Sequence, residues 1–238
     1  MRAVRSVGNG VRGKHWLDHE EGAKFIRIVI IADTHKLHRE LELPPGEILI
    51  HAGDFTFWGK QRSDVRDFDD WLAELPHAYK IVVPGNHEFV LEDPRLRDEI
   101  TNAELLIDQG IEIAGLKIWG SPVTPLYGGA FGMSKPADRK RHWTHVPDKL
   151  DILITHGPPF GILDAAVGTD GHQGDGELLE AVNRAKPRLH IFGHIHAAHG
   201  TVQTERTRFI NAALYGEFGD LDKPPIVVDL AGAGSGEH

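Results

Sequence analysis

Five apolar segments, each followed by aspartate, asparagine or histidine, constrain the fold of this chain more than any other feature of its sequence. The first is Val29–Ile31, a β-branched run that leads into Asp33-Thr34-His35. The other four lead into Gly53-Asp54, Gly85-Asn86-His87-Glu88, Thr155-His156-Gly157 and Gly193-His194-Ile195-His196. Continuous apolar runs are typical of strands covered on both faces, and ligands lie at the carboxyl ends of such strands in open α/β sheets. The pattern therefore predicts an α/β fold in which five strands bring acidic, amide and imidazole groups to one edge.

The absence of cysteine restricts the metals that such an edge could bind. The chain of 238 residues contains 16 histidines and no cysteine, so disulfides and thiolate ligands are excluded. Nitrogen and oxygen ligands suit Mn, Fe, Zn, Co, Ni or Mg, and the residue types alone leave this choice open.

The net charge argues against a protein that grips long nucleic acids. The formal charge is −9 at pH 7, whereas nonspecific affinity for nucleic acids comes from Lys and Arg side chains that neutralise phosphates. Small anionic substrates remain compatible with this charge, because a local metal cluster can supply the positive charge that the surface lacks.

The two ends of the chain are predicted to be flexible tails around one domain. Residues 1–24 are basic but contain no apolar core of the kind that a secretory signal needs, so a flexible tail is favoured over a transit peptide. No apolar run is long enough to span a membrane, and a soluble, cytoplasmic protein is expected. Residues 25–230 form the expected single domain, and residues 231–238 form the second tail.

Periodicity and turn residues predict the remaining elements. A helix is expected at 64–75, with Ser63 as its N-cap, and a second helix is expected to have Asp175 as its cap and to end at Pro187. A tight hairpin is expected at 111–119 and a short helix within 93–108. Two or three short strands, at about 201–203, 207–210 and 225–230, are expected to be antiparallel.

Three further segments bear on substrate binding. The aromatic loop Phe55–Gly59 could stack a base or ring of a substrate, or it could pack under the next helix. The basic cluster Arg139–His142 could meet a phosphate, although a solvated helix face is favoured. Residues 121–133, which include Tyr127 and Phe131, are predicted to form a flap that lines the substrate site.

Taken in order, the motifs D-x-H, G-D, G-N-H-E, T-H-G-P-P and G-H-I-H resemble the motif set of the calcineurin-like metallophosphoesterase superfamily. The resemblance extends over residues 25–230. The stretches 80–88, 154–160, 187–196 and 224–230 are similar to the small metallophosphoesterase-domain-containing proteins first known from vertebrate brain and to their bacterial relatives. In a vertebrate branch, glycine replaces the first histidine of G-H-I-H. His194 is present here, so both metal positions are expected to fill.

This resemblance implies a two-sheet β sandwich flanked by helices and a site for two divalent metal ions. Mn or Fe is expected, with Zn, Co or Ni as alternatives. One ion would be held by Asp33, His35, Asp54 and His196, and the other by Asp54, Asn86, His156 and His194. Asp54 would bridge the two ions, and His87 would stay free above the site to meet the substrate.

The implied site favours a phosphodiesterase. Two neighbouring ions can share a hydroxide at neutral pH and polarise phosphoryl oxygens, while His87 donates a proton to the leaving group. Asp54, Asn86 and His87 are therefore the expected catalytic residues. The expected substrate is a small, nucleotide-like phosphodiester such as a cyclic nucleotide, and no long nucleic acid or membrane is expected as a partner. A phosphomonoesterase or phosphoprotein phosphatase is the alternative, and a non-catalytic scaffold on the same fold is less favoured. The sequence fits a monomer or a homodimer.

Overall fold

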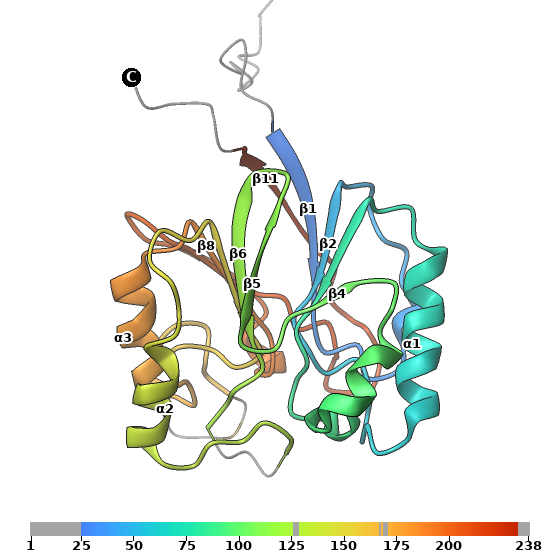
Figure 1. Cartoon of the computed structure of the whole chain (residues 1–238), viewed down its shortest axis with the longest axis horizontal. Coiled ribbons are helices and arrows are strands. Elements are labelled where there is room, and N and C mark those ends of the chain that lie inside the picture. Colours follow the sequence, from blue (N-terminus) through green and yellow to red (C-terminus); the bar gives the residue numbers. More distant parts are fainter. Residues whose placement is uncertain (1–24, 126–128, 167, 169–170, 233–238) are drawn as a thin grey trace, which may run out of the picture.

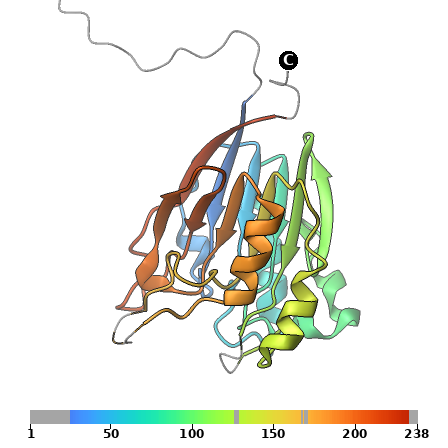
Figure 2. The same cartoon turned by 90° about the vertical axis from the view of Figure 1, so that its left-hand side faces the viewer.

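The structure, a computed structural model, describes residues 25–125, 129–166, 168 and 171–232 of the chain. Two β-sheets pack face to face, and helices cover the outer face of each sheet (Figure 1). The view turned by 90° shows the strands of both sheets running in similar directions (Figure 2). This architecture confirms the predicted α/β sandwich flanked by helices.

The first sheet contains five strands in the order β11-β1-β2-β3-β4. Their bounds are β1 Phe25–Ile31, β2 Ile48–His51, β3 Tyr79–Val82, β4 Glu104–Leu105 and β11 Ile226–Ala231. Strands β1 to β4 are parallel, and β11 pairs with β1 in the antiparallel direction.

The second sheet contains six strands in the order β5-β6-β7-β8-β10-β9. Their bounds are β5 Gln109–Ile113, β6 Leu116–Ser121, β7 Ile152–Thr155, β8 Leu189–Phe192, β9 Gly200–Gln203 and β10 Arg208–Asn211. Strands β6, β7, β8 and β10 are parallel, whereas β5 and β9 are antiparallel edge strands. The hairpin of β5 and β6 confirms the prediction for 111–119.

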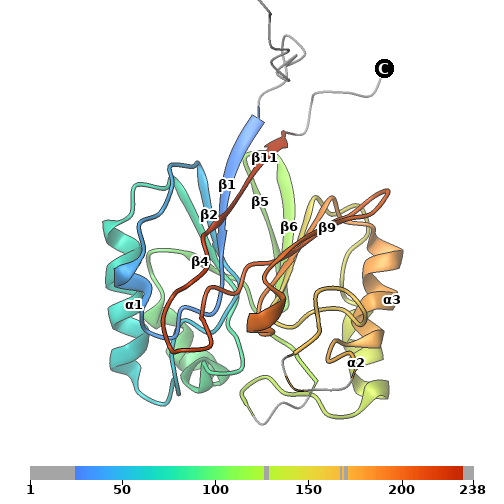
Figure 3. The ribbon, with the colours of Figure 1, turned by 180° about the vertical axis from the view of Figure 1, so that it is seen from behind.

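In the described part of the chain, three α-helices cover the sheets. Helix α1 (Arg62–Glu74) lies on the first sheet, and α2 (Pro136–Trp143) and α3 (Gly176–Ala185) lie on the second, as the view from behind also shows (Figure 3). Short 3-10 helices occupy His38–Glu40, Phe89–Glu92, Pro94–Glu99 and His196–Ala198.

The second half of strand β1, Ile28–Ile31, is apolar because both of its faces are covered. Ile28 and Ile30 pack between the two sheets, whereas Val29 and Ile31 pack under α1. All four side chains are fully buried. The continuous β-branched run is therefore covered on both faces, as the sequence predicted.

The two sheets approach each other at the carboxyl ends of their strands. The backbone N–H of Ala32 donates to the carbonyl of Ala212 at 2.9 Å, and the N–H of Leu214 donates to the carbonyl of Ala32 at 2.9 Å. The segment after β10 thus pairs with the end of β1. This junction brings the loops after β1, β2 and β3 close to those after β7 and β8.

Three predicted elements differ from the structure. Helix α1 begins at Arg62 with Gln61 at its cap position, because the N–H of Asp64 already donates to the carbonyl of Gln61, so Ser63 lies inside the helix. The range 93–108 contains the 3-10 helix Pro94–Glu99 followed by β4 in place of an α-helix. Strand β10 is antiparallel to β9 but parallel to β8, so the antiparallel prediction is wrong for one of its two neighbours.

The predicted cap of α3 is confirmed and explains part of the basic cluster. The carboxylate of Asp175 accepts from the N–H of Glu177 at 3.1 Å and from Nε1–H of Trp143 at 2.8 Å. It also lies 3.0 Å from Nε of the buried Arg139. Arg139 therefore joins α2 to α3 and is not part of a solvated face, whereas Lys140 is exposed and pairs with Glu180, as the favoured interpretation requires.

The described part of the chain includes no helix with the length and apolarity that crossing a bilayer requires. The predicted tail at 1–24, residues 233–238 of the second predicted tail, and Tyr127 lie outside the described residues. Strand β11 continues to Ala231, one residue beyond the predicted domain boundary.

Candidate metal centre

Four of the predicted metal ligands have left-handed backbone conformations. The φ angle is 54° at Asp33, 42° at His35, 58° at Asp54 and 68° at His194. This conformation costs a residue with a Cβ atom roughly 1–2 kcal/mol, and such strain gathers at functional sites. The loops therefore hold these side chains in directions that a relaxed backbone would not give them.

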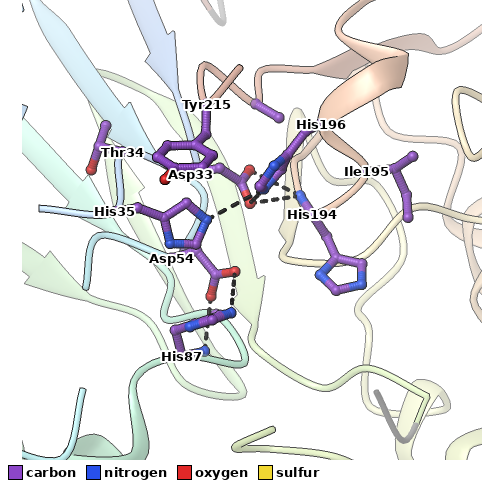
Figure 4. A network of polar contacts seen from close by, with 12 residues as sticks. Asp33, Thr34, His35, Asp54, His87, His194, Ile195, His196 and Tyr215 are labelled. Carbon is purple, nitrogen blue, oxygen red and sulfur yellow. Dashed lines mark hydrogen bonds and ion pairs between the residues drawn. The ribbon is translucent and has the colours of Figure 1, made fainter. Parts of the chain in front are cut away.

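The first group of potential ligands combines loops from both sheets. Asp33 and His35 follow β1, and His196 follows β8. Nε2 of His196 lies 3.3 Å from Oδ1 of Asp33 and 3.3 Å from Nε2 of His35 (Figure 4). One ligand atom from each residue lies within 4.8 Å of the others, which is close enough for one ion.

The second group also draws on both sheets. Ligand atoms of Asp54, His156 and His194, from the loops after β2, β7 and β8, lie within 4.8 Å of one another. Nε2 of His156 lies 3.2 Å from Oδ2 of Asp54 and 2.9 Å from Oδ1 of Asn86. The structure thus brings together all the residues predicted to hold metal. That they bind metal stays a prediction.

Asp54 lies where the two groups meet. A third set of ligand atoms within 4.8 Å of one another comes from His35, Asp54 and His87. Asp54 is therefore close to residues of both predicted ion positions. This arrangement fits the bridging role that the family resemblance implies for its carboxylate.

The hydrogen bonds of two histidines show that these side chains fit a cation. Nδ1 of His35 donates to the carbonyl of Thr56 at 3.0 Å, and Nδ1 of His156 donates to the carbonyl of Ala52 at 2.9 Å. A backbone carbonyl on one ring nitrogen leaves the lone pair of the other free, which is how metal-binding histidines are oriented. The Nε2 lone pair of His156 then faces the oxygens of Asp54 and Asn86, an arrangement of acceptors that only a proton or a metal cation satisfies.

The electrostatics favour positive charge at the same place. Burial alone would raise the pKa of both carboxyl groups, but His196 lowers the pKa of Asp33 and His156 lowers the pKa of Asp54. Burial likewise opposes a charge on His156, yet Asp54 and Asp33 raise the pKa of that imidazole to about 10. The oxygens that hold a proton on His156 would also attract a divalent cation.

His87 lies on the Asp54 side of the site, apart from His194 and His196 (Figure 4). Its backbone N–H donates to Oδ1 of Asp54 at 2.9 Å, and its ring Nδ1 is hydrogen-bonded to the carbonyl of Phe57. Nε2 lies 3.9 Å from Oδ2 of Asp54, and the side chain is 20% exposed. The ring is thus anchored through one nitrogen while the other faces the site.

Glu88, for which the sequence favours a supporting role, organises the loops around the site through hydrogen bonds. Its buried carboxylate accepts from the N–H groups of Gly85 at 2.6 Å, Asp54 at 2.8 Å and Thr56 at 2.9 Å, and from the Thr56 hydroxyl at 2.8 Å. Burial, together with the charge of Asp54, raises the pKa of Glu88 to about 7. His51 has a similar supporting role, since its ring bonds the Thr34 hydroxyl at 3.0 Å.

Two further features border the site. A cavity of about 410 Å³ lies beside His194 and His196 and is lined also by Ile195, Ala197, Glu217 and Lys223. The ring of Tyr215 lies 4.7 Å from that of His35. Neither Tyr215 nor Lys223 belongs to a recognisable motif, so the sequence carried no signal for them.

Part of the predicted flap contacts the site. The N–H of Ala130 donates to the carbonyl of Asn86 at 2.8 Å, and a Cβ added at Gly129 would lie 2.4 Å from the same oxygen. These residues support the backbone of Asn86. The prediction that 121–133 lines the substrate stays a prediction.

Comparison with known proteins agrees with this geometry. The profile of the calcineurin-like phosphoesterase family matches residues 26–198. Human metallophosphoesterase domain-containing protein 1 is 36% identical over 233 residues, which cover 87% of this chain and 71% of the human protein. A UPF0046 protein of Caenorhabditis elegans is 38% identical over 228 residues, covering 86% of this chain and 81% of the worm protein. One solved crystal structure, 15% identical, has a TM-score of 0.62 over 87% of this chain and 95% of its own, and shares the fold. The chain therefore belongs to the calcineurin-like phosphoesterase family and is a metal-dependent phosphoesterase.

Proposed function

We propose that this phosphoesterase is a phosphodiesterase that uses two divalent metal ions, Mn or Fe before Zn, Co or Ni, to hydrolyse small phosphodiesters such as cyclic nucleotides. The observation that carries the proposal is the pair of adjacent ligand groups that meet at Asp54, with His87 anchored beside them. When bound, the ions would supply positive charge for the phosphoryl oxygens and lower the pKa of water to give a nucleophile at neutral pH.

The ligand set leaves positive charge for an anionic substrate. Asp33 and Asp54 are the only carboxylates in the proposed set, and the remaining ligands are an amide and histidines that are neutral as ligands. Two divalent ions with two carboxylates retain roughly two positive charges before water is counted. A phosphodiester monoanion is attracted to such a site.

The residues of the chain divide the remaining tasks. Asn86 is held by the flap through Ala130 and orients its amide oxygen toward His156. His87 is placed to donate a proton from Nε2 to the leaving oxygen, since its Nδ1 is engaged by the Phe57 carbonyl. A diester brings two organic groups, and the site is bordered on its His196 side by the cavity and on its His87 side by aromatic rings. This arrangement supports a diester more than a monoester.

The test is hydrolysis of an aryl phosphodiester and the matching monoester by metal-stripped protein, with Mn, Fe, Zn, Co, Ni and Mg restored one at a time. We expect metal-dependent turnover that is faster for the diester. Asp54→Asn should abolish it while the far-ultraviolet circular dichroism stays unchanged. Asp229→Asn, at an exposed aspartate of β11, is the matched control and should retain activity.

The other outcomes point to the alternatives. Faster turnover of the monoester would replace the phosphodiesterase with a phosphatase. No turnover with any of the metals would leave the non-catalytic scaffold as the better description. Normal activity in Asp54→Asn would contradict the two-metal mechanism.

A further inference from the structure

The aromatic loop after β2 has two parts that do different things. Phe55 is fully buried, and its ring stacks on that of Phe68 in α1 with centroids 4.0 Å apart. Phe57 and Trp58, by contrast, are 41% and 60% exposed. Packing under the helix therefore accounts for Phe55 only.

The two exposed rings lie beside the proposed proton donor. The centroid of the Trp58 ring is 5.3 Å from that of His87, and that of Phe57 is 6.1 Å from it. Phe57 and Trp58 also contact each other edge to face at 6.0 Å. Two neighbouring aromatic side chains left open to solvent at the edge of an active site form a surface suited to another flat ring.

The backbone holds this surface in place. The carbonyl of Gly59 accepts from the N–H of Val90 at 2.9 Å, and the N–H of Thr56 donates to the Glu88 carboxylate at 2.9 Å. Gly59 has a φ of 32°, and a Cβ there would lie 2.0 Å from the carbonyl oxygen of His87. The loop is thus fastened on both sides of Trp58 to the segment that carries His87, which fixes the distance between the two rings.

We propose that Trp58, assisted by Phe57, is a specificity-determining residue that stacks on an aromatic ring in the leaving group of the phosphodiester, such as a nucleobase or an aryl group. The proposal rests on the function proposed above. In that reaction water forms a new P–O bond and gives up a proton, while the P–O bond to the leaving group breaks and its oxygen takes a proton from Nε2 of His87. The ester group beside His87 is therefore the one that leaves, and of the two exposed rings that of Trp58 lies nearer to His87.

The retained ester group has a separate place. The cavity of about 410 Å³ lies beside His194 and His196, which Figure 4 shows apart from His87. Its walls combine the apolar Ile195 and Ala197 with the charged Glu217 and Lys223, and no Phe, Tyr or Trp side chain lines it among the described residues. The two sides of the site thus differ in chemistry, and an asymmetric diester would bind in one preferred direction.

The experiment is an internal competition in one substrate, benzyl cyclohexylmethyl phosphate. Its two ester groups have similar size and similar leaving-group chemistry, but only one is a flat ring. The measured quantity is the ratio of benzyl alcohol to cyclohexylmethanol released by the metal-loaded protein. This ratio does not depend on the amount of active enzyme or on the degree of metal loading.

We expect the wild-type ratio to exceed that of Trp58→Ala by about fivefold or more, because stacking of one ring on an aromatic side chain supports a preference of this size. Trp58→Phe should keep part of the preference. Tyr79→Ala, which removes an exposed aromatic ring from the other end of β3, is the matched control and should leave the ratio unchanged. Calorimetry with benzyl phosphate and cyclohexylmethyl phosphate should show tighter binding of the benzyl compound, and Trp58→Ala should lose this difference.

The failures can be told apart. Equal release of both alcohols by the wild type, or a ratio that Trp58→Ala leaves unchanged, would overturn the stacking proposal while the phosphodiesterase stands. Absence of turnover of this diester and of every aryl diester would overturn the proposed function, and the stacking proposal would fall with it.

Discussion

Gly85→Ala tests whether the site depends on the close approach of the backbone to its ligands. A Cβ at this position would lie 2.2 Å from Oδ1 of Asp54 and 2.7 Å from Cε1 of His156, whereas ordinary contacts begin at 3.4 Å. The carboxylate or the backbone must therefore move by roughly 1 Å, and misplacement of this size can lower a reaction rate by about 10²-fold. Because φ at Gly85 is not in the left-handed region, the added methyl group acts by steric overlap alone.

The overlap should also appear in stability and in metal content. Forcing an extra methyl group into a packed site typically costs about 1–3 kcal/mol. We expect Gly85→Ala to lower the free energy of unfolding by that amount in urea, to weaken binding of at least one ion in calorimetry, and to lower turnover of an aryl diester about 10²-fold.

Two glycines serve as comparisons. A Cβ at Gly193 would lie 2.1 Å from Oδ2 of Asp33, so Gly193→Ala should disturb the other ligand group in the same way. Gly176, in the first turn of α3, has no atom within 4 Å of an added Cβ, so Gly176→Ala should be neutral or slightly stabilising. Two bound ions and near-normal turnover in Gly85→Ala would refute the reasoning.

Three other substitutions test separate parts of the structure. His87→Gln should slow hydrolysis of alkyl diesters by about 10²–10⁴-fold. The rate with p-nitrophenyl diesters should fall much less, since p-nitrophenolate leaves without a proton. Equal losses in the steady-state rates of the two substrates would argue against proton donation by His87. Burial lowers the pKa of His190 to about 3. Below pH ~6.5 the unfolded chain therefore takes up a proton at His190, whereas the folded chain does not. The free energy of unfolding then falls as the pH falls from ~6.5 toward the folded pKa, by up to about 1.4 kcal/mol per pH unit. His190→Leu should reduce that slope in urea unfolding between pH ~6 and ~5, and an unchanged slope would contradict the burial argument. Asp175→Ala removes the partner of buried Arg139 and of the Trp143 indole as well as the cap of α3. The free energy of unfolding should therefore drop by about 3 kcal/mol or more. A loss below ~1 kcal/mol in chemical denaturation would show that these contacts contribute little to stability.

The sequence predicted the location of the site better than the pairing of the strands. Parallel strands end at a common edge, so residues that follow apolar runs were expected to meet, and those after β1, β2, β3, β7 and β8 do. Pairing depends on distant segments. The short turn between β9 and β10 favours an antiparallel hairpin, which forms, but the parallel contact of β10 with β8 is decided by packing that no local pattern records.

The same distinction applies to the residues around the site. His35 and His196 lie in motifs and could be named, whereas Tyr215 reaches His35 from a loop without any recognisable pattern. The aromatic loop shows an intermediate case. Its composition allowed both stacking on a substrate and packing under α1, and only the burial of Phe55 and the exposure of Trp58 assign different tasks to its residues.

The strained backbone at Asp54 is stabilised by hydrogen bonds to the Glu88 carboxylate. Asp54 is held at a φ of 58°, a conformation that costs roughly 1–2 kcal/mol. The Glu88 carboxylate accepts the N–H of Asp54 itself and that of Gly85, so it fixes the bridging aspartate against the loop that carries Asn86. A hydrogen bond contributes about 0.5–1.5 kcal/mol even without a full charge on the acceptor, so these two bonds together are of the size needed to offset the strain. The glutamate of G-N-H-E is thus best understood as the clamp between the loops after β2 and β3, and the asparagine and histidine before it depend on that clamp for their positions.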